Sequence, residues 1–297
     1  MIYGSNETSA ILVCCFCAHK RRGQRVFAFF LFLMDNKEAP IYFISDAHLG
    51  LPIKGCDSRE EHLIDFLREI ASGGSDLYIV GDLFDFWIEY GRAIRPDYFF
   101  ILCELSQLVK KGVVIHYLAG NHDFALGPFI EKTIGVETHL DHYETLLQGK
   151  KIHLYHGDGL IRHDVGYRIL KKILRFPLNQ KIYKCIHPNI GVPLGSICSG
   201  SSRKVTSRFI TENVLQEYRD HAFEYLKQGN DIVVFGHTHR PEIKHWDGKT
   251  YCNTGEWIEK YTFAKLENGK MTLWQYKPGE KPQEIVESSL KKGSNAS

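Results

Sequence analysis

Five short apolar segments, rich in β-branched and aromatic residues, each stop at a cluster of polar residues. Such segments are typical of buried strands. They are Ile41–Ile44, Leu77–Val80, Val113–Leu118, Ile152–Tyr155 and Ile232–Phe235. Helical patterns over Arg59–Ala71 and Asp97–Lys110 separate the early strands, and this alternation predicts an α/β sheet. Because ligands of such sheets bind beyond the carboxyl ends of the strands, we expect the five polar clusters to converge at one edge.

The second half of the chain departs from this alternation in two ways. The strand patterns at about Thr250–Asn253, Thr262–Leu266 and Met271–Tyr276 have no helices between them, so they predict an antiparallel part, in a mixed sheet or a second sheet. Gly159–Asn230 is too long for a structureless loop and has helical periodicity. We therefore predict a helical cap over about residues 160–230, covering the sheet edge.

The composition bounds the class of protein. The 297 residues suit one large domain, and no apolar run reaches the roughly 18–20 residues that a membrane-spanning helix needs. A formal net charge of +2 argues against a protein that binds nucleic acid over its whole surface. The eight cysteines have no regular spacing, which favours reduced thiols in a cytoplasmic protein.

The two ends of the chain differ from the middle. Residues 1–33 alternate between apolar and basic runs, in the wrong order for a secretory signal. Cys14, Cys15, Cys17 and His19 suggest a metal knuckle, but we expect residues 1–33 to be a non-native or disordered extension. The enzyme domain is then expected over residues 34–280, starting at Met34, and residues 281–297 form a polar tail.

The polar clusters contain seven side chains of metal-ligand type. Asp46 with His48, and His237 with His239, stand two residues apart, a spacing that points two side chains the same way on an extended strand end. The full set is Asp46, His48, Asp82, Asn121, His156, His237 and His239.

Seven ligands exceed what one ion takes from a protein, whereas two ions that share Asp82 account for the number. Mixed nitrogen and oxygen ligation suits manganese, iron or zinc and disfavours a structural zinc site built on cysteines. Two ions about 3.5–4 Å apart are a common arrangement for phosphoryl hydrolysis. The alternative, that these residues have no shared function, would need five unrelated coincidences at five strand ends.

These residues carry a family resemblance. Asp46-x-His48, Gly81-Asp82-x-x-Asp85, Gly120-Asn121-His122-Asp123, His156-Gly157-Asp158 and Gly236-His237-x-His239 resemble the signature of calcineurin-like metallophosphoesterases, over about residues 40–256. The resemblance implies an α/β fold, a two-sheet αββα sandwich with a dimetal site at its edge and, here, a helical cap insertion.

The resemblance also implies roles for individual residues. Asp46, His48, Asp82 and His239 would hold one ion, and Asp82, Asn121, His156 and His237 the other. His122, held by Asp123, would be the imidazole that contacts the scissile phosphate and stabilises charge or protonates the leaving group. The alternative for His122 is a buried structural histidine.

The predicted cap is strongly basic. Residues 162–208 contain ten Lys and Arg against one acid, Asp164, which favours an anion-binding role over a merely solvated face. A helix predicted at about Asp164–Phe176 is two-faced, with an apolar stripe opposite a basic one. Such a helix suits an acylated anion or an anionic membrane surface, and the alternative is that its apolar stripe packs on the domain. The apolar stripe is Val165, Ile169, Ile173 and Phe176, and the basic one is Arg168, Lys171, Lys172 and Arg175.

One branch of the family matches the chain further. Gly81–Ile88, the segment from Asn121 to Gly127, and His156-Gly157-Asp158 followed by Asp164-x-Gly166-Tyr167 look like UDP-2,3-diacylglucosamine pyrophosphatases of lipid A biosynthesis. At position 122 that branch commonly has Arg, whereas this chain has His. The resemblance implies hydrolysis of a lipid-linked nucleotide sugar to UMP and 2,3-diacylglucosamine 1-phosphate. It also implies two divalent ions, manganese first and iron, zinc or magnesium as alternatives.

The same resemblance implies a cytoplasmic protein on the inner face of the inner membrane, with no nucleic-acid partner; the oligomeric state stays open. Residues expected to contact the substrate are Asp164, Tyr167, Arg168, Arg203 and Lys204. The alternative function is a metallophosphoesterase for another phosphodiester, a phosphomonoester or a nucleotide. A non-catalytic scaffold would be expected to have lost ligands, and none of the seven is missing.

Overall fold

The computed structural model describes residues 39–52, 56, 58–71, 73, 75–162 and 164–286, apart from the side chains of residues 198 and 200–209. The predictions for residues 1–33 and for 287–297 of the tail lie outside this range. So do the side chains of Arg203 and Lys204.

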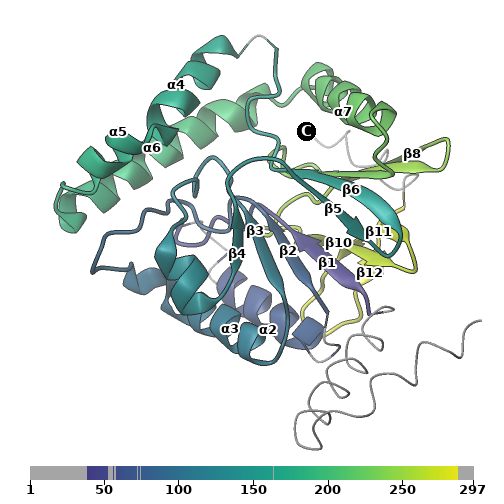
Figure 1. Cartoon of the computed structure of the whole chain (residues 1–297), viewed down its shortest axis with the longest axis horizontal. Helices are drawn as coiled ribbons and strands as arrows, with labels where there is room; N and C mark the ends of the chain where they lie inside the picture. Colours follow the sequence, from purple (N-terminus) through teal and green to yellow (C-terminus); the bar gives the residue numbers. More distant parts are fainter. Residues whose placement is uncertain are drawn as a thin grey trace, which may run out of the picture. The chain divides into compact units, whose positions relative to one another are not determined.

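The first sheet has seven strands in the order β12-β11-β10-β1-β2-β3-β4 (Figure 1). Strands β1 to β4 are parallel, and β10 to β12 add an antiparallel extension on the other side of β1. Their bounds are Ile41–Ile44 for β1, Leu77–Val80 for β2, Ile115–Leu118 for β3, Glu137–His139 for β4, Thr262–Glu267 for β10, Lys270–Gln275 for β11 and Gln283–Glu284 for β12.

The second sheet has five strands in the order β5-β6-β7-β9-β8. Strands β6, β7 and β9 are parallel at its centre, and β5 and β8 are antiparallel edge strands. The bounds are Tyr143–Leu147 for β5, Lys150–Tyr155 for β6, Ile232–Phe235 for β7, Glu242–Trp246 for β8 and Lys249–Asn253 for β9.

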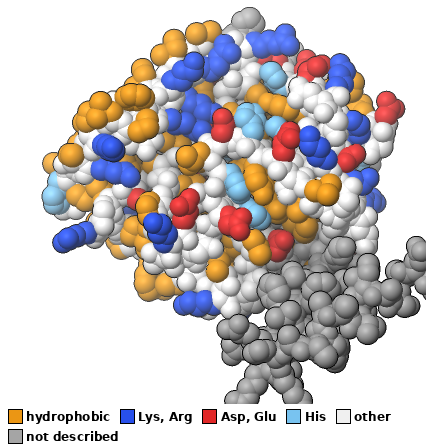
Figure 2. Space-filling model, in the orientation of Figure 1, with side chains coloured by type: hydrophobic (Ala, Val, Ile, Leu, Met, Phe, Trp, Pro, Cys, Tyr) orange, Lys and Arg blue, Asp and Glu red, His pale blue; other side chains and the backbone are white. Residues whose placement is uncertain are grey.

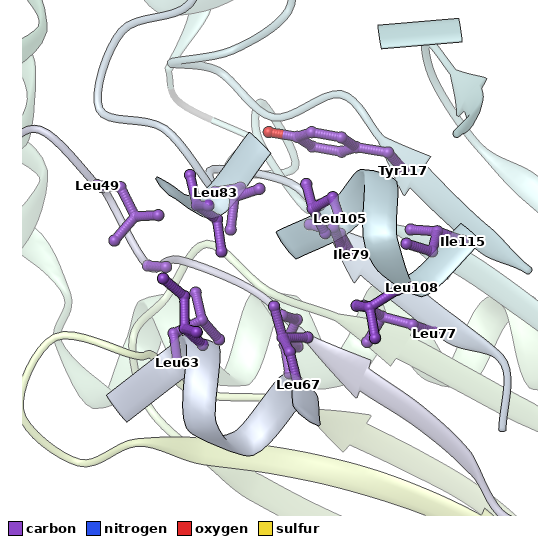
Figure 3. Packing of buried hydrophobic residues seen from close by; sticks show 14 of the residues in the cluster. Leu49, Leu63, Leu67, Leu77, Ile79, Leu83, Leu105, Leu108, Ile115 and Tyr117 are labelled. Carbon is purple, nitrogen blue, oxygen red and sulfur yellow. The ribbon is translucent and has the colours of Figure 1, made fainter. Parts of the chain in front are cut away.

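Three apolar clusters hold four layers together. Helices α2 (Arg59–Ala71) and α3 (Phe99–Lys110) cover the outer face of the first sheet, where Leu63, Leu67 and Leu105 pack against Ile79 and Tyr117 (Figures 1 and 3). A second cluster, with Phe43, Val80 and Leu154, lies between the two sheets. Helix α7 (Glu212–Lys227) covers the second sheet through Tyr218, Ala222 and Leu226. The result is the predicted two-sheet αββα sandwich, because each sheet face needs an apolar partner.

The cap is narrower than the predicted residues 160–230. Helices α4 (Val165–Arg175), α5 (Pro177–Tyr183) and α6 (Pro188–Phe209) form a separate group at one end of the sheets (Figure 1). Helix α7 lies instead against strands β7 and β9. The difference arises because α7 has a buried apolar face, whereas no residue of α4 or α5 is buried.

The buried strands and helices α2, α3 and α4 fall close to their predicted bounds, and the antiparallel part is present. The sequence pattern missed β4, β5, β8 and the two-residue β12 in the predicted polar tail, and the short helices at Pro96–Tyr98 and Phe129–Ile134. These strands lie at sheet edges and are largely exposed or half-buried, so they lack the continuous apolar run that marks an interior strand. The described cysteines, Cys56, Cys103, Cys185 and Cys252, are all free thiols.

Candidate metal centre

All seven predicted ligand residues lie together where strands of both sheets end. Asp46 and His48 follow β1, Asp82 follows β2 and Asn121 follows β3, while His156 and the His237–His239 pair follow β6 and β7. Asp46, His48, Asp82 and His156 are each 1% exposed or less. The site therefore occupies the seam between the two sheets.

The first group consists of Asp46, His48 and His239. The Nε2 atoms of His48 and His239 are 3.2 Å apart, and Asp46 Oδ1 lies 3.3 Å from His239 Nε2 and 3.8 Å from His48 Nε2. Asp46 Oδ2 accepts a hydrogen bond from the His237 backbone N–H at 2.9 Å, whereas buried Oδ1 accepts none. The carboxylate thus presents one unsatisfied oxygen to two imidazole nitrogens, a donor set that suits a divalent cation.

The second group consists of Asn121, His156 and His237. His156 Nε2 lies 3.1 Å from Asn121 Oδ1 and 3.2 Å from His237 Nδ1. Because His156 Nδ1 donates to the Val80 carbonyl at 2.8 Å, the ring is oriented so that Nε2 faces the other ligand atoms.

Asp82 connects the two groups. Its Oδ2 lies 3.2 Å from His156 Nε2 and 3.8 Å from His48 Nε2, while its Oδ1 accepts the His122 backbone N–H at 2.9 Å. One oxygen is thereby oriented by the backbone and the other faces both groups. This is the arrangement required of a carboxylate that bridges two ions.

The backbone at the site is held in a sparsely populated conformation. Five of the seven residues have positive φ angles: Asp46 53°, His48 44°, Asp82 53°, His237 66° and His239 54°. A left-handed conformation costs a residue with a side chain roughly 1–3 kcal/mol, and it persists only where the surroundings fix it. Backbone hydrogen bonds between strand ends, including Asp46 N to Gly81 O at 3.1 Å and His48 N to Asp82 O at 3.0 Å, provide that fixation.

The two buried carboxylates of the site, Asp46 and Asp82, are stabilised in their ionised form by neighbouring histidines. Burial alone would raise the pKa of Asp46, but His239 and His156 hold it at about 2. Burial would likewise raise the pKa of Asp82, yet His156 and His122 hold it well below its usual range. Burial opposes protonation of His156, but Asp82 raises its pKa to about 10. Two buried carboxylates therefore stay ionised and need positive charge beside them, which protonated histidine or a bound cation supplies.

His122 lies beside the ligand groups, 6% exposed, with its Nε2 3.9 Å from Asp82 Oδ2. Its Nδ1 donates to the Asp85 carbonyl at 3.0 Å and contacts Ser199 Oγ, whose hydroxyl donates to the same carbonyl at 2.7 Å. Ser199 belongs to cap helix α6, so the cap reaches the site through a residue that the sequence pattern did not mark.

The expectation that Asp123 holds His122 is wrong. The Asp123 carboxylate accepts from the backbone N–H groups of Gly120 and Asp82, at 2.8 and 3.2 Å, and from the Tyr117 hydroxyl. Burial and the neighbouring Asp82 raise the pKa of Asp123 to about 6. Asp123 therefore fixes the loop that carries Asn121, because backbone N–H groups at the strand end need an acceptor.

Of the predicted substrate-binding residues whose side chains the structure describes, one lines the cavity beside the metal-ligand residues and two do not. Asp164 caps helix α4, accepting the Tyr167 backbone N–H at 3.0 Å, and Arg168 is exposed and donates to the Arg162 carbonyl at 2.8 Å. Neither lines the cavity beside the metal-ligand residues. Tyr167 does line it, and its hydroxyl donates to Asp158 Oδ2 at 2.9 Å.

Asp158 fastens the cap to the sheets, a role that the sequence did not reveal although it stands in the His156-Gly157-Asp158 motif. Its buried carboxylate pairs with Lys171 at 2.9 Å and with Arg175 at 3.6 Å, both from α4. Burial would raise the pKa of Asp158, but Arg175 and Lys171 hold it at about 2. Arg175 also donates to the Gly120 carbonyl at 3.0 Å, so the cap is tied to the loop of Asn121.

A cavity of about 440 Å³ runs from this site under the cap. Asn121, His122 and Ser199 line its inner end, and its walls are mostly apolar. The apolar lining residues include Phe86, Trp87, Phe124, Leu170, Ile173, Leu174 and Leu194. An apolar cavity with polar groups at one end is suited to a ligand with an acyl part and a charged head.

Comparison with known proteins gives consistent matches. The family model described as calcineurin-like phosphoesterase matches residues 39–241. A UDP-2,3-diacylglucosamine hydrolase of Porphyromonas gingivalis is 30% identical over 252 residues, 78% of this chain and 96% of that protein. Enzymes of the same name from Nitrosococcus oceani and Haemophilus influenzae are 31% identical (69% of this chain, 80% of that protein) and 28% identical (74% and 91%).

Replacing Gly120 by alanine tests how tightly the ligand loop is packed. A Cβ at Gly120 would overlap the Asp82 carboxylate and lie 2.6 Å from the Asp82 backbone nitrogen, both of which are fixed. We expect Gly120→Ala to lower metal occupancy and to reduce kcat/KM at least about 100-fold, as misplacement of ligand groups does. Gly91→Ala is the control, because a Cβ there meets no atom within 4 Å. Equal metal content in the two variants would contradict this account.

Proposed function

The chain belongs to the calcineurin-like phosphoesterase family and is a metal-dependent phosphohydrolase, and from this we propose that its substrate is UDP-2,3-diacylglucosamine. Water is added across the diphosphate, which gives UMP and 2,3-diacylglucosamine 1-phosphate. The observation that carries the proposal is the apolar cavity that opens directly from the metal-ligand residues under the cap. A phosphohydrolase of free nucleotides has no use for such a cavity.

The proposal assigns the ligands to two ions. Asp46, His48 and His239 would hold one ion, Asn121, His156 and His237 would hold the other, and Asp82, whose carboxylate lies between the two groups, would contribute to both. Manganese is our first choice for both ions, since the carboxylate and amide oxygens of the donor set suit it; iron and zinc, which the imidazoles suit, are the alternatives. Bound there, divalent ions activate water and neutralise phosphoryl oxygens.

The protein groups around this centre orient the substrate and move a proton. Because Nδ1 of His122 is engaged with the Asp85 carbonyl, Nε2 is the nitrogen available to the phosphate. As an imidazolium it donates to a phosphoryl oxygen or to the departing oxygen. Lys171 and Arg175 line the cavity and are themselves fixed by Asp158, so they present positive charge to the anionic head at little entropic cost.

The first experiment compares two substrates on the manganese-loaded protein. We expect UMP release from UDP-2,3-diacylglucosamine and little turnover of a bis-aryl phosphodiester. Leu174→Gln places a polar group in the cavity wall and is expected to lower kcat/KM for the acylated substrate about 10-fold, the cost of one apolar contact. Phe100→Gln, at an exposed residue of helix α3 outside the cavity and away from the cap, is the control. Turnover of the aryl ester alone would refute the substrate assignment.

A second pair of variants separates metal binding from proton transfer. Asp82→Ala removes the bridging oxygen and should abolish both activity and occupancy of the two ion positions. His122→Ala should keep both ions and lose about 100- to 10,000-fold in kcat, the usual contribution of a positioned acid. Metal content by mass spectrometry and steady-state rates distinguish the two. Full activity of His122→Ala would remove its assigned role.

We further propose that the cap docks on the cytoplasmic face of an anionic membrane. Three residues of the apolar stripe of α4, Val165, Ile169 and Phe176, are 53–55% exposed and lie outside the cavity, whereas the fourth, Ile173, lines it. This exposure, together with the ion pairs of Lys171 and Arg175 with Asp158, supports docking over the alternative in which the stripe packs on the domain. Figure 2 displays hydrophobic side chains over the end of the molecule that carries α4 to α6. No helix of the described residues is long and apolar enough to span a bilayer.

Vesicle sedimentation tests the membrane proposal. The double variant Ile169→Asp/Phe176→Asp places charge on the outward stripe and should bind vesicles rich in phosphatidylglycerol at least about 10-fold more weakly than the unchanged chain. Phe100→Asp is the control, since Phe100 is 68% exposed but lies on α3, away from the cap. No vesicle binding by the unchanged chain, or an equal loss in the control, would refute the proposal.

A further inference from the structure

A second group of metal-ligand side chains lies at the edge of the first sheet. It consists of His116 on β3 and of Glu137 and His139 on β4, which we call the edge-strand cluster. None of its members belongs to the strand-end centre or lines the cavity under the cap. The proposed hydrolysis makes no use of them.

Strand register brings the three side chains together. Strands β3 and β4 are parallel, with His116 opposite Glu137 and Leu118 opposite His139. Alternate residues of a strand point to the same face, so all three side chains project from the same face of the sheet. Two rings fix the imidazoles there: Tyr78 stacks on His116 with centroids 4.4 Å apart, and Tyr143 of β5 stacks on His139 at 3.7 Å.

The separations fit a shared ion. His116 Nδ1 lies 3.2 Å from His139 Nε2 and 3.3 Å from Glu137 Oε2, and the three ligand atoms are all within 4.8 Å of one another. A tetrahedral zinc ion with bonds of about 2.0–2.1 Å holds neighbouring ligand atoms about 3.3 Å apart. A hydrogen on His116 Nδ1 can form a well-aligned hydrogen bond with only one of the two atoms, His139 Nε2 or Glu137 Oε2. An ion bound by all three atoms accounts for both short distances.

Burial also fits an open metal site. His116 is 8% exposed and His139 is half-buried, while the Glu137 side chain is 63% exposed. The two imidazoles are thus supported by the protein, and the carboxylate closes the site from the solvent side. An ion can enter from solvent and keep a water molecule as its remaining ligand.

We propose that His116, Glu137 and His139 bind one divalent transition-metal ion, zinc by their chemistry, separately from the ions at the strand ends. Two imidazoles and a carboxylate are a usual zinc donor set. The ion links β3 to the three-residue edge strand β4, which otherwise depends on a short ladder of backbone bonds. Since the His139 carbonyl accepts the Ala119 N–H at 2.8 Å, the linkage supports the base of the loop that carries Asn121.

Zinc titration of the full chain tests the proposal, with Asp82→Ala as the background that removes the strand-end ions. In this background we expect one zinc equivalent and a zinc-dependent rise in melting temperature. Adding Glu137→Gln should weaken that binding at least 10-fold; because Glu137 is exposed, the fold is retained. His116→Ala/His139→Ala should abolish it, and His245→Ala, at an exposed histidine of β8, should leave it unchanged.

The outcomes are distinct. If the Asp82→Ala chain binds no zinc, or if Glu137→Gln and His245→Ala bind zinc equally well, the edge-strand cluster is not a metal site. In the chain with Asp82 intact, Glu137→Gln should lose one equivalent of zinc and keep the ions at the strand ends. Failure of the substrate assignment would leave this stoichiometry unaffected, so the two proposals stand or fall separately.

Discussion

The structure depends on keeping two ionised carboxylates buried at the seam of two sheets. Asp46 and Asp82 lose their hydration there and are surrounded by imidazoles, an amide and backbone N–H groups. Such a cluster is unfavourable unless cations balance it, and five of its residues also hold left-handed backbone angles. Burial of the apolar layers on both sides supplies the free energy that offsets this strain. The packed sheets in turn hold these polar side chains close to one another.

The cap differs from the rest of the fold in which side chains its helices bury. Helix α4 turns Lys171 and Arg175 toward Asp158 and Leu170 and Leu174 toward the cavity, while Ile169 and Phe176 are exposed. In water the exposed residues give up apolar burial. Arg175 also donates to the Gly120 carbonyl, and the Ser199 hydroxyl donates to the Asp85 carbonyl, which His122 also contacts. The cap is thus tied to the loops that follow β2 and β3.

Some strands and helices could be predicted from the sequence and others could not, and the reasons are physical. Strands β1, β2, β6 and β7 were predictable because burial on both faces makes them continuously apolar. Helix α4 was predictable because it arises from a local pattern, whereas Asp164, expected to contact substrate, caps this helix instead. Strands β4, β5 and β8 were missed because edge strands lack such a pattern, and α7 was grouped with the cap because periodicity does not say which surface a helix covers.

The amino-acid sequence by itself determined which polar side chains meet, since Asp, His and Asn directly after five buried strands come together wherever the carboxyl ends of those strands meet. It also determined the layers, through the alternation of apolar segments. Only the tertiary structure decided which partner each polar group takes: that Asp123 holds a backbone loop rather than His122, that Asp158 holds the cap, and that His116 meets His139 across two strands. These pairings join residues through space, and a linear pattern carries no information on the directions in which side chains point after the chain has turned.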